Sequence, residues 1–359
     1  MTSQKQQTLY EGNGQTGKEL KTYEVLVDTM KPEHYLAKPG LKNAVNVALT
    51  LGQPLLVTGE PGTGKTQLAS SIAYEFSNLP LFSFHVKSTS VAQDLFYQYD
   101  AIRRFQDSHV ANQSIDTRKY IDFKALGLAI LLTLPPEKAD EYLPKQYQGK
   151  GPTRSVILLD EIDKAPRDLP NDILIEIEKM EFSVKEIDRP PFQANKSFRP
   201  IIVITSNSEK NLPDAFLRRC VYYHIPFPSP EELKTIVKRR FQDDPIIGQR
   251  LSDDLIDAVN DHFLDIRKHL NLKKKPATAE ILAWFSILHA IDLDTETILK
   301  GLKQNDPDIG TLTEKFKASY TVLGKTYEDL KRMEQYFEKD LQQEGHVLRI
   351  IDALNRAGY

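Results

Sequence analysis

The chain has 359 residues, more than one compact domain usually holds, so we expect two or three domains. Apolar residues make up 40% of it, enough for a sizeable core, and the net charge of −3 provides no overall basic field for nucleic-acid binding. The single cysteine, Cys220, excludes an internal disulfide and favours a reducing, cytoplasmic location. We expect no secretory signal in the polar segment 1–21. We also expect no membrane insertion, because the apolar stretch 125–134 is shorter than the ~18 residues of a membrane span.

Residues 1–30 are predicted to form a polar, flexible tail. The segment from Gly12 to Glu19 contains the pattern G-x-x-x-x-G-K, but no apolar strand precedes it. Glu19 also replaces the hydroxyl that would ligate Mg²⁺, so we discount this segment as a phosphate site.

The segment before the first strand predicts a helix over residues 41–51, where apolar residues have helical spacing. Tyr35 and Leu36 come just before this helix. They either pack against it only or also contact a nucleotide base.

A Gly-rich loop that follows the apolar run 55–57 is the strongest motif in the chain. In a strand–loop–helix unit, the loop N–H groups can surround a phosphate chain, and the helix presents its positive end to it. Lys65 can reach the outer phosphates, and the Thr66 hydroxyl can ligate Mg²⁺. The predicted nucleotide-binding residues are Tyr35, Leu36, Gly59, Glu60, Pro61, Gly62, Thr63, Gly64, Lys65, Thr66 and Gln67.

Residues 81–86 predict a second strand, and residues 91–105 predict a helix that is capped by Ser90. The loop between them is either a substrate-contact loop or an ordinary helix cap. Residues 106–152 are predicted to be an insertion, with a helix over 120–134 and then a long loop rich in Pro and Gly. No catalytic pattern occurs in the insertion, and His109 is expected to be a surface residue.

Two acids follow the apolar run 156–159, which indicates a buried parallel strand that ends at a ligand crevice. Asp160 can hold the hydration shell of Mg²⁺, so the predicted metal residues are Thr66 and Asp160, mostly through water. Glu161 can polarise the attacking water as a general base. Such acids can also be merely solvated, but the phosphate loop about 95 residues earlier favours the catalytic interpretation.

Another buried strand, 200–206, follows a predicted amphipathic helix over 167–180 and a short hairpin that starts near residue 182. Asn207 then either closes the strand as a turn residue or hydrogen-bonds the attacking water and the terminal phosphate. Arg218 and Arg219 are either surface charge or a source of positive charge for the transition state in a neighbouring subunit. The predicted catalytic residues are Lys65, Glu161, Asn207, Arg218 and Arg219.

From Ser229 onwards, the chain is almost wholly helical by its periodicity, and Ser229, Pro230 and Glu232 form a helix-start pattern. We therefore predict an α/β nucleotide-binding domain over 31–226, a helical lid over 227–300 and additional C-terminal helices over 301–359. The predicted fold class is an α/β P-loop NTPase core with a parallel sheet, followed by an all-helical lid.

With these motifs in place, the chain resembles the AAA+ ATPases, and within them the MoxR-like group, over roughly residues 35–288. Residues 59–66 resemble the Walker A motif, and residues 158–166 resemble the Walker B motif with its extension. Residues 204–207 resemble sensor 1, and residues 214–220 resemble the arginine-finger segment. The resemblance implies a three-layer α/β domain with a helical lid. It also implies Mg²⁺-dependent ATP hydrolysis in a ring, commonly a hexamer, with ATP sites at subunit boundaries. It implies Arg219 as the finger, with Arg218 as the alternative.

The resemblance also implies a chaperone-like role in which the ring remodels or activates a partner protein, often one with a von Willebrand factor A domain. The chain departs from the family pattern because residues 276–281 lack the sensor-2 arginine of many relatives. That role is therefore vacant or is taken by Lys275.

Other functions compete with this one. A nucleic-acid motor or loader is disfavoured by the acidic net charge and by the lack of a basic-aromatic strip. A slow nucleotide-dependent switch stays open. GTP is disfavoured because the guanine-reading sequence Asn-Lys-x-Asp is absent, and the residues Asp160, Glu161 and Asn207 suit hydrolysis better than a small-molecule kinase reaction.

Overall fold

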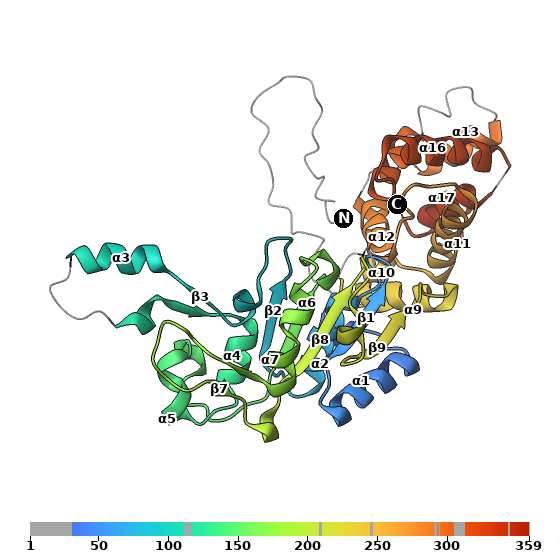
Figure 1. The fold of residues 1–359 in the computed structure, drawn as a ribbon. Helices are drawn as coiled ribbons and strands as arrows, with labels where there is room; N and C mark the ends of the chain where they lie inside the picture. Colours follow the sequence, from blue (N-terminus) through green and yellow to red (C-terminus); the bar gives the residue numbers. More distant parts are fainter. Residues whose placement is uncertain are drawn as a thin grey trace.

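A five-stranded parallel sheet is the centre of the N-terminal part of the protein (Figure 1). The computed structural model describes residues 31–110, 116–207, 210–244, 247–290, 293, 295–304, 313–343 and 345–358, so the predicted tail and the side chain of His109 lie outside the described part. The strand order is β2-β5-β8-β1-β9, and all four neighbouring pairs run parallel. The strands are β1 (Leu55–Gly59), β2 (Leu81–His85), β5 (Val156–Asp160), β8 (Ile201–Ser206) and β9 (Val221–Ile225).

Both faces of the sheet are covered, because successive side chains of its central strands enter different cores. Leu55 and Val57 pack on one face with α1 and α2, whereas Leu56 and Ile157 pack on the other face with α4, α6 and α7. This arrangement confirms the three-layer α/β fold. The helices are α1 (Pro39–Leu51), α2 (Lys65–Glu75), α4 (Ala125–Leu131), α5 (Pro136–Ala139), α6 (Leu169–Asp172), α7 (Leu174–Lys179) and α8 (Asp214–Leu217).

The helix predicted over residues 91–105 is wrong in its first half. This segment contains a short 3₁₀ helix, η2 (Ala92–Leu95), then strand β3 (Tyr97–Tyr99), and only then helix α3 (Ala101–Val110). The residues of β3 pair antiparallel with β4 (Ile121–Phe123), so the helix predicted over 120–134 also begins late, at α4. In both strands, aromatic or apolar residues alternate with a polar residue, Gln98 or Asp122, and this pattern favours pairing over helix. In Figure 1, the two strands lead out to α3, which projects away from the sheet.

The helix predicted over residues 167–180 is divided into α6 and α7 at Ile173. Asn171 and Asp172 precede the break, and both residue types are poor helix formers. The predicted hairpin is present as β6 (Glu181–Phe182) paired with β7 (Phe192–Gln193). Further 3₁₀ helices are η1 (Pro32–His34), η3 (Thr117–Tyr120), η4 (Asp140–Tyr142), η5 (Lys145–Tyr147), η6 (Ile162–Lys164), η7 (Lys196–Phe198) and η8 (Tyr320–Val322).

The C-terminal part is helical and has its own core, to which residues on both sides of position 300 contribute. Trp284, Phe263, Phe316 and Phe337 are all fully buried in it. Among the described residues, no helix combines the length and apolar character needed to span a membrane. The helices are α9 (Pro230–Phe241), α10 (Ile247–Arg250), α11 (Asp253–His269), α12 (Thr278–Ala290), α13 (Thr295–Gln304), α15 (Glu314–Ser319), α16 (Tyr327–Gln342) and α17 (His346–Arg356).

Candidate nucleotide-binding site

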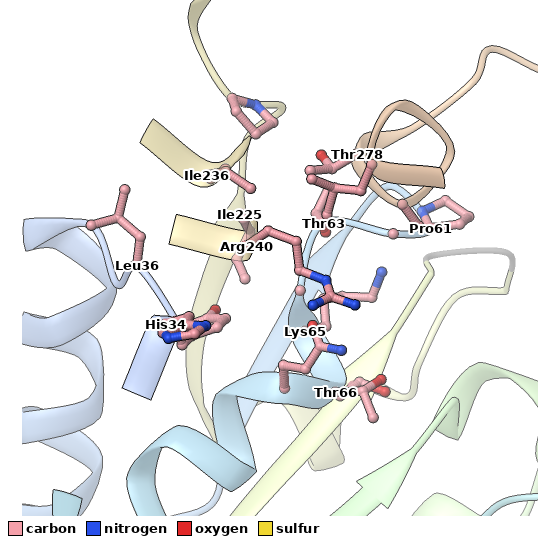
Figure 2. Close-up of a pocket in the computed structure, with 18 of the residues that line it drawn as sticks. His34, Leu36, Pro61, Thr63, Lys65, Thr66, Ile225, Ile236, Arg240 and Thr278 are labelled. Atoms are coloured by element: carbon pink, nitrogen blue, oxygen red, sulfur yellow. The ribbon is translucent and has the colours of Figure 1, made fainter. Parts of the chain in front are cut away.

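A pocket of about 610 Å³ lies between the α/β part and the helical lid (Figure 2). Its size and position match a small-molecule site between two domains. The carboxyl ends of β5 and β8 and the loop after β1 form one side, and helices α9 and α12 of the lid contribute to the other. Of the predicted residues, the lining includes Tyr35, Leu36, Pro61, Gly62, Thr63, Gly64, Lys65, Thr66, Gln67, Asp160, Glu161 and Asn207.

The loop after β1 has a backbone that only glycine adopts easily. Gly62 and Gly64 have φ values of 75° and 86°. A Cβ atom on Gly62 would lie 3.2 Å from the lid residues Ala277 and Ala279, so glycine also permits the close approach of the lid. Gly64 is the N-cap of α2, whose positive end faces the pocket. The loop therefore has the geometry of a phosphate cradle.

Lys65 is buried and folds back over the loop. Its Nζ donates hydrogen bonds to the carbonyl oxygens of Gly59 and Glu60, both at 2.8 Å. Burial lowers the pKa of Lys65, and the carboxylates of Asp160 and Asp163 oppose that shift. Gly59 and Glu60 are not lining residues, and they act here as the carbonyl acceptors that hold the lysine.

Asp160 receives polar contacts from three different elements. Oδ1 accepts hydrogen bonds from the hydroxyls of Thr66, at 3.0 Å, and Thr205, at 2.6 Å. Oδ2 lies 3.2 Å from Nδ1 of His85. The Thr66 hydroxyl and the Asp160 carboxylate are hard oxygen donors at the edge of the phosphate loop, so the residues present fit Mg²⁺. Thr205 was missed by the sequence reasoning, although its position two residues before Asn207 on β8 could have indicated it.

Glu161 and Asn207 meet at the same edge of the sheet. Asn207 Nδ2 donates to Oε1 of Glu161 at 3.3 Å, and Lys164 Nζ donates to Oε2 at 2.5 Å. The Glu161 backbone is left-handed, with φ of 60°, and its N–H donates to the Thr205 hydroxyl at 2.9 Å. A strained backbone held by a hydrogen bond fixes the direction of this carboxylate. The pair can orient a water molecule and accept a proton from it.

Tyr35 lies against the phosphate loop, where a Cβ atom on Gly64 would be 3.1 Å from its ring. Burial raises the pKa of Tyr35, with a further contribution from Tyr223, so its hydroxyl stays protonated. Together with Leu36 and Ile225, these rings form an apolar wall of the pocket that can face a base.

The paired arginines lie outside the pocket lining. Arg219 is half exposed, and it donates from Nε to Oε2 of Glu178 at 3.2 Å and from a guanidinium N–H to the carbonyl oxygen of Ala215 at 3.1 Å. The structure therefore does not bring Arg218 or Arg219 to the pocket of their own chain.

Two lid arginines were missed by the sequence reasoning. Arg240, near the end of α9, lines the same pocket as Lys65, and both side chains are labelled in Figure 2. Arg267 on α11 forms an ion pair with Glu60 of the phosphate loop at 2.8 Å, and its guanidinium carbon lies 3.7 Å from the centre of the Phe227 ring. Lys275, the candidate for the vacant sensor-2 role, is not among the lining residues. The run of basic residues 238–240 could have indicated Arg240. It does not show that the Arg240 side chain lines the pocket.

Residues 54–220 match the family model of the AAA domain of the dynein-related subfamily. The match contains the phosphate loop, Asp160, Glu161, Asn207 and the paired arginines, so this part of the chain is similar to AAA domains. No curated protein matches the sequence significantly. One solved structure, described as a "putative ATPase" from Cytophaga hutchinsonii, has 13% identity and a TM-score of 0.38, and the alignment covers 84% of this chain and 81% of that chain. With so low a TM-score, this structural likeness carries no argument about the protein. The similarity to AAA domains therefore depends on the family match and on the geometry of the site.

Proposed function

We propose that the protein hydrolyses ATP with Mg²⁺ as a MoxR-like AAA+ ATPase. The observation that carries the proposal is the meeting of Glu161 and Asn207, joined at 3.3 Å, at the edge of a pocket that also contains Lys65 and Thr66. A bare phosphate site needs the loop alone, whereas hydrolysis also needs a base and a group that orients water.

Each residue has a separate task in this reaction. Lys65 leaves the loop carbonyls and neutralises charge on the outer phosphates. Asn207 orients the attacking water, and Glu161 accepts its proton. Thr66 and Asp160 would hold Mg²⁺, which supplies charge neutralisation at the phosphates when it is bound.

The first test is Glu161→Gln, which keeps the shape of the side chain and removes the base. We expect ATP binding to be retained and kcat to fall by at least about a hundredfold. Lys65→Ala is the matched control, because it should lose binding itself. Hydrolysis by Glu161→Gln at the wild-type rate would contradict the assignment of the base.

We further propose that the active form is a ring, commonly a hexamer in the family that the chain resembles. Support comes from Arg218 and Arg219, which lie outside the pocket of their own chain, with Arg219 half exposed. An arginine in that position can complete the site of a neighbouring subunit.

Mixing two inactive variants tests this arrangement. Lys65→Ala subunits cannot bind ATP but keep the finger, whereas Arg219→Ala subunits bind ATP but lack the finger. We expect mixtures to recover part of the ATPase activity, with Arg218→Ala measured in the same way as the alternative. A complete lack of recovery at every ratio, or a wild-type protein that stays monomeric with ATP, would contradict the proposal.

The work done by hydrolysis is proposed to be the remodelling or activation of a partner protein, possible partners being proteins with a von Willebrand factor A domain. This part is supported by the resemblance alone, and a cytoplasmic location by the single cysteine. Glu161→Gln should trap the partner in an affinity purification with ATP and release it with ADP. ATPase stimulation by DNA, with no trapped protein, would instead favour a nucleic-acid motor.

A further inference from the structure

A polar cluster lies inside the helical part, outside the lining of the nucleotide pocket. It consists of His262 on α11, Asp340 on α16 and His346 on α17, and one potential ligand atom from each residue lies within 4.8 Å of the others. We propose that this cluster binds one divalent transition-metal ion of the zinc class.

His262 is a fully buried residue with only half of its hydrogen-bonding capacity used. Its Nε2 lies 2.6 Å from the hydroxyl of Tyr320, whereas its Nδ1 has no hydrogen-bond partner. A buried ring nitrogen without a partner is costly unless something binds it. With Nε2 donating to Tyr320, Nδ1 has the free lone pair that a metal ligand needs, and the tyrosine fixes the ring orientation.

Asp340 and His346 are close in the chain, because α16 ends at Gln342 and α17 begins at His346. One carboxylate oxygen of Asp340, Oδ2, accepts the backbone N–H of Val347 at 2.7 Å, which leaves Oδ1 available. Nδ1 of His346 lies 3.9 Å from that Oδ1 and has no hydrogen-bond partner. A Cβ atom on Gly345 would lie 2.3 Å from Oδ1, so glycine is required for this approach.

A second carboxylate borders the cluster. Asp265 on α11 has Oδ2 at 3.4 Å from Nδ1 of His346 and at 3.0 Å from the hydroxyl of Tyr336. Its Oδ1 lies 3.3 Å from the exposed His269. Two imidazoles with two carboxylates nearby are a typical donor set for zinc, and the negative charge balances a divalent ion.

The ion would link three helices, which are α11 in the lid and α16 and α17 in the C-terminal segment. Helix α11 belongs to the lid, and α17 packs along it (Figure 1). The alternative is that His346 is protonated and pairs with Asp265 and Asp340. The proton would then occupy the nitrogen lone pair that a metal ion needs. The two occupants differ in metal content, which can be measured directly.

The test uses the full chain without an affinity tag, stripped of metal and then dialysed against Zn²⁺ or Co²⁺. We expect about one retained equivalent, a higher Tm, and Co²⁺ absorption bands typical of four-coordinate sites. His346→Ala changes a partly exposed residue, and Asp340→Asn retains an acceptor for Val347, so both variants should fold. Both should lose the retained metal and the increase in Tm.

Two controls separate this site from others. His269→Ala removes an exposed histidine of the same helix, and Asp160→Asn removes the metal residue of the nucleotide site. Both variants should retain about one equivalent of metal. The proposal is overturned if the wild-type chain retains no metal, or if His346→Ala and Asp340→Asn retain as much metal as the wild type. Because no readout involves ATP turnover, failure here leaves the ATPase proposal intact.

Discussion

At the scale of single residues, Thr205 links Asp160, the proposed metal residue, to Glu161, the proposed base. Its hydroxyl donates to Oδ1 of Asp160 at 2.6 Å and accepts the N–H of Glu161 at 2.9 Å, and the residue is only 1% exposed. The hydroxyl thus positions two functional carboxylates through one buried oxygen. It acts through its neighbours and is a positioning residue.

Thr205→Val keeps the shape of the side chain and removes this oxygen. The buried N–H of Glu161 would lose its partner, so we expect a stability loss of about 1–3 kcal/mol. We also expect kcat to fall about tenfold with a small change in KM, because binding of the phosphates is intact while the base is displaced. Denaturant unfolding and steady-state kinetics measure the two effects. Thr205→Ser, which retains the hydroxyl, should restore most of kcat, and equal losses in both variants would contradict the positioning role.

Arg240 adds a second positive charge to the lining of the pocket that contains Lys65. Its removal should weaken the binding of ATP more than that of ADP, because the charge difference lies in the terminal phosphate. For Arg240→Gln, we expect a rise in Kd for ATP of about tenfold, as for the loss of one charged hydrogen bond. Arg239→Gln, at the adjacent position of α9 and outside the lining, is the matched control. Equal effects on the two nucleotides would remove Arg240 from the phosphate site.

At the scale of elements, helix α9 has a capped first turn at Ser229 and a last turn that lines the pocket. Ser229 Oγ accepts the N–H of Glu232 at 3.3 Å, and Glu232 accepts the N–H of Ser229 at 2.7 Å, which is the capping box that the sequence predicts. The opposite end of the helix carries Arg240. The same helix is also attached to α1, because Lys38 Nζ lies 2.7 Å from Oε2 of Glu232.

Ser229→Ala should therefore cost about 0.5–2 kcal/mol of stability, with most of the loss in the lid. Hydrogen exchange should show faster opening of the first turn of α9. Thermal or denaturant unfolding measures the total loss of stability. Ser229→Thr is the control, since threonine is also a good cap and should retain most of the stability. An identical loss in both variants would mean that packing at this position, not capping, stabilises the helix.

At the scale of the whole molecule, the lid is attached to the phosphate loop by Arg267. Its guanidinium forms the ion pair with Glu60, stacks on Phe227 and donates to the carbonyl oxygen of Pro276. Glu60 is 48% exposed at its side chain, whereas Arg267 is 9% exposed. The ion pair joins the phosphate loop to helix α11 of the lid, so lid position and loop conformation are coupled through it.

This difference in exposure predicts that substitutions of Glu60 and Arg267 lower the free energy of unfolding by different amounts. Glu60→Gln should cost less than about 1 kcal/mol, because solvent screens a half-exposed pair. Arg267→Gln should cost more, since it also loses the stacking on Phe227 and a buried hydrogen bond. Unfolding of both single variants and the double variant gives the coupling energy. Equal losses for the two single variants would contradict the assignment of the stacking and the backbone contact to Arg267.

The sequence by itself determined the class of fold and half of the site. Continuous apolar runs predicted the buried strands, because a parallel sheet covered on both faces allows few polar side chains. The Gly-rich loop and the two acids at the end of β5 were recognisable for a local reason, since phosphate and metal chemistry needs those residue types at fixed spacing. Where two structures compete for the same short segment, as at β3, local periodicity was insufficient, because a strand there depends on a partner more than twenty residues away.

Only the tertiary structure decided which distant side chains meet. The hydroxyl of Thr205 reaches Asp160 because β5 and β8 are neighbours in the sheet, and the lid arginines reach the loop because α9 and α11 fold back over it. His262, Asp340 and His346 come together from three helices in the same way. Such contacts depend on strand order and helix packing, which involve residues far apart in the chain and leave no pattern in any one stretch of sequence.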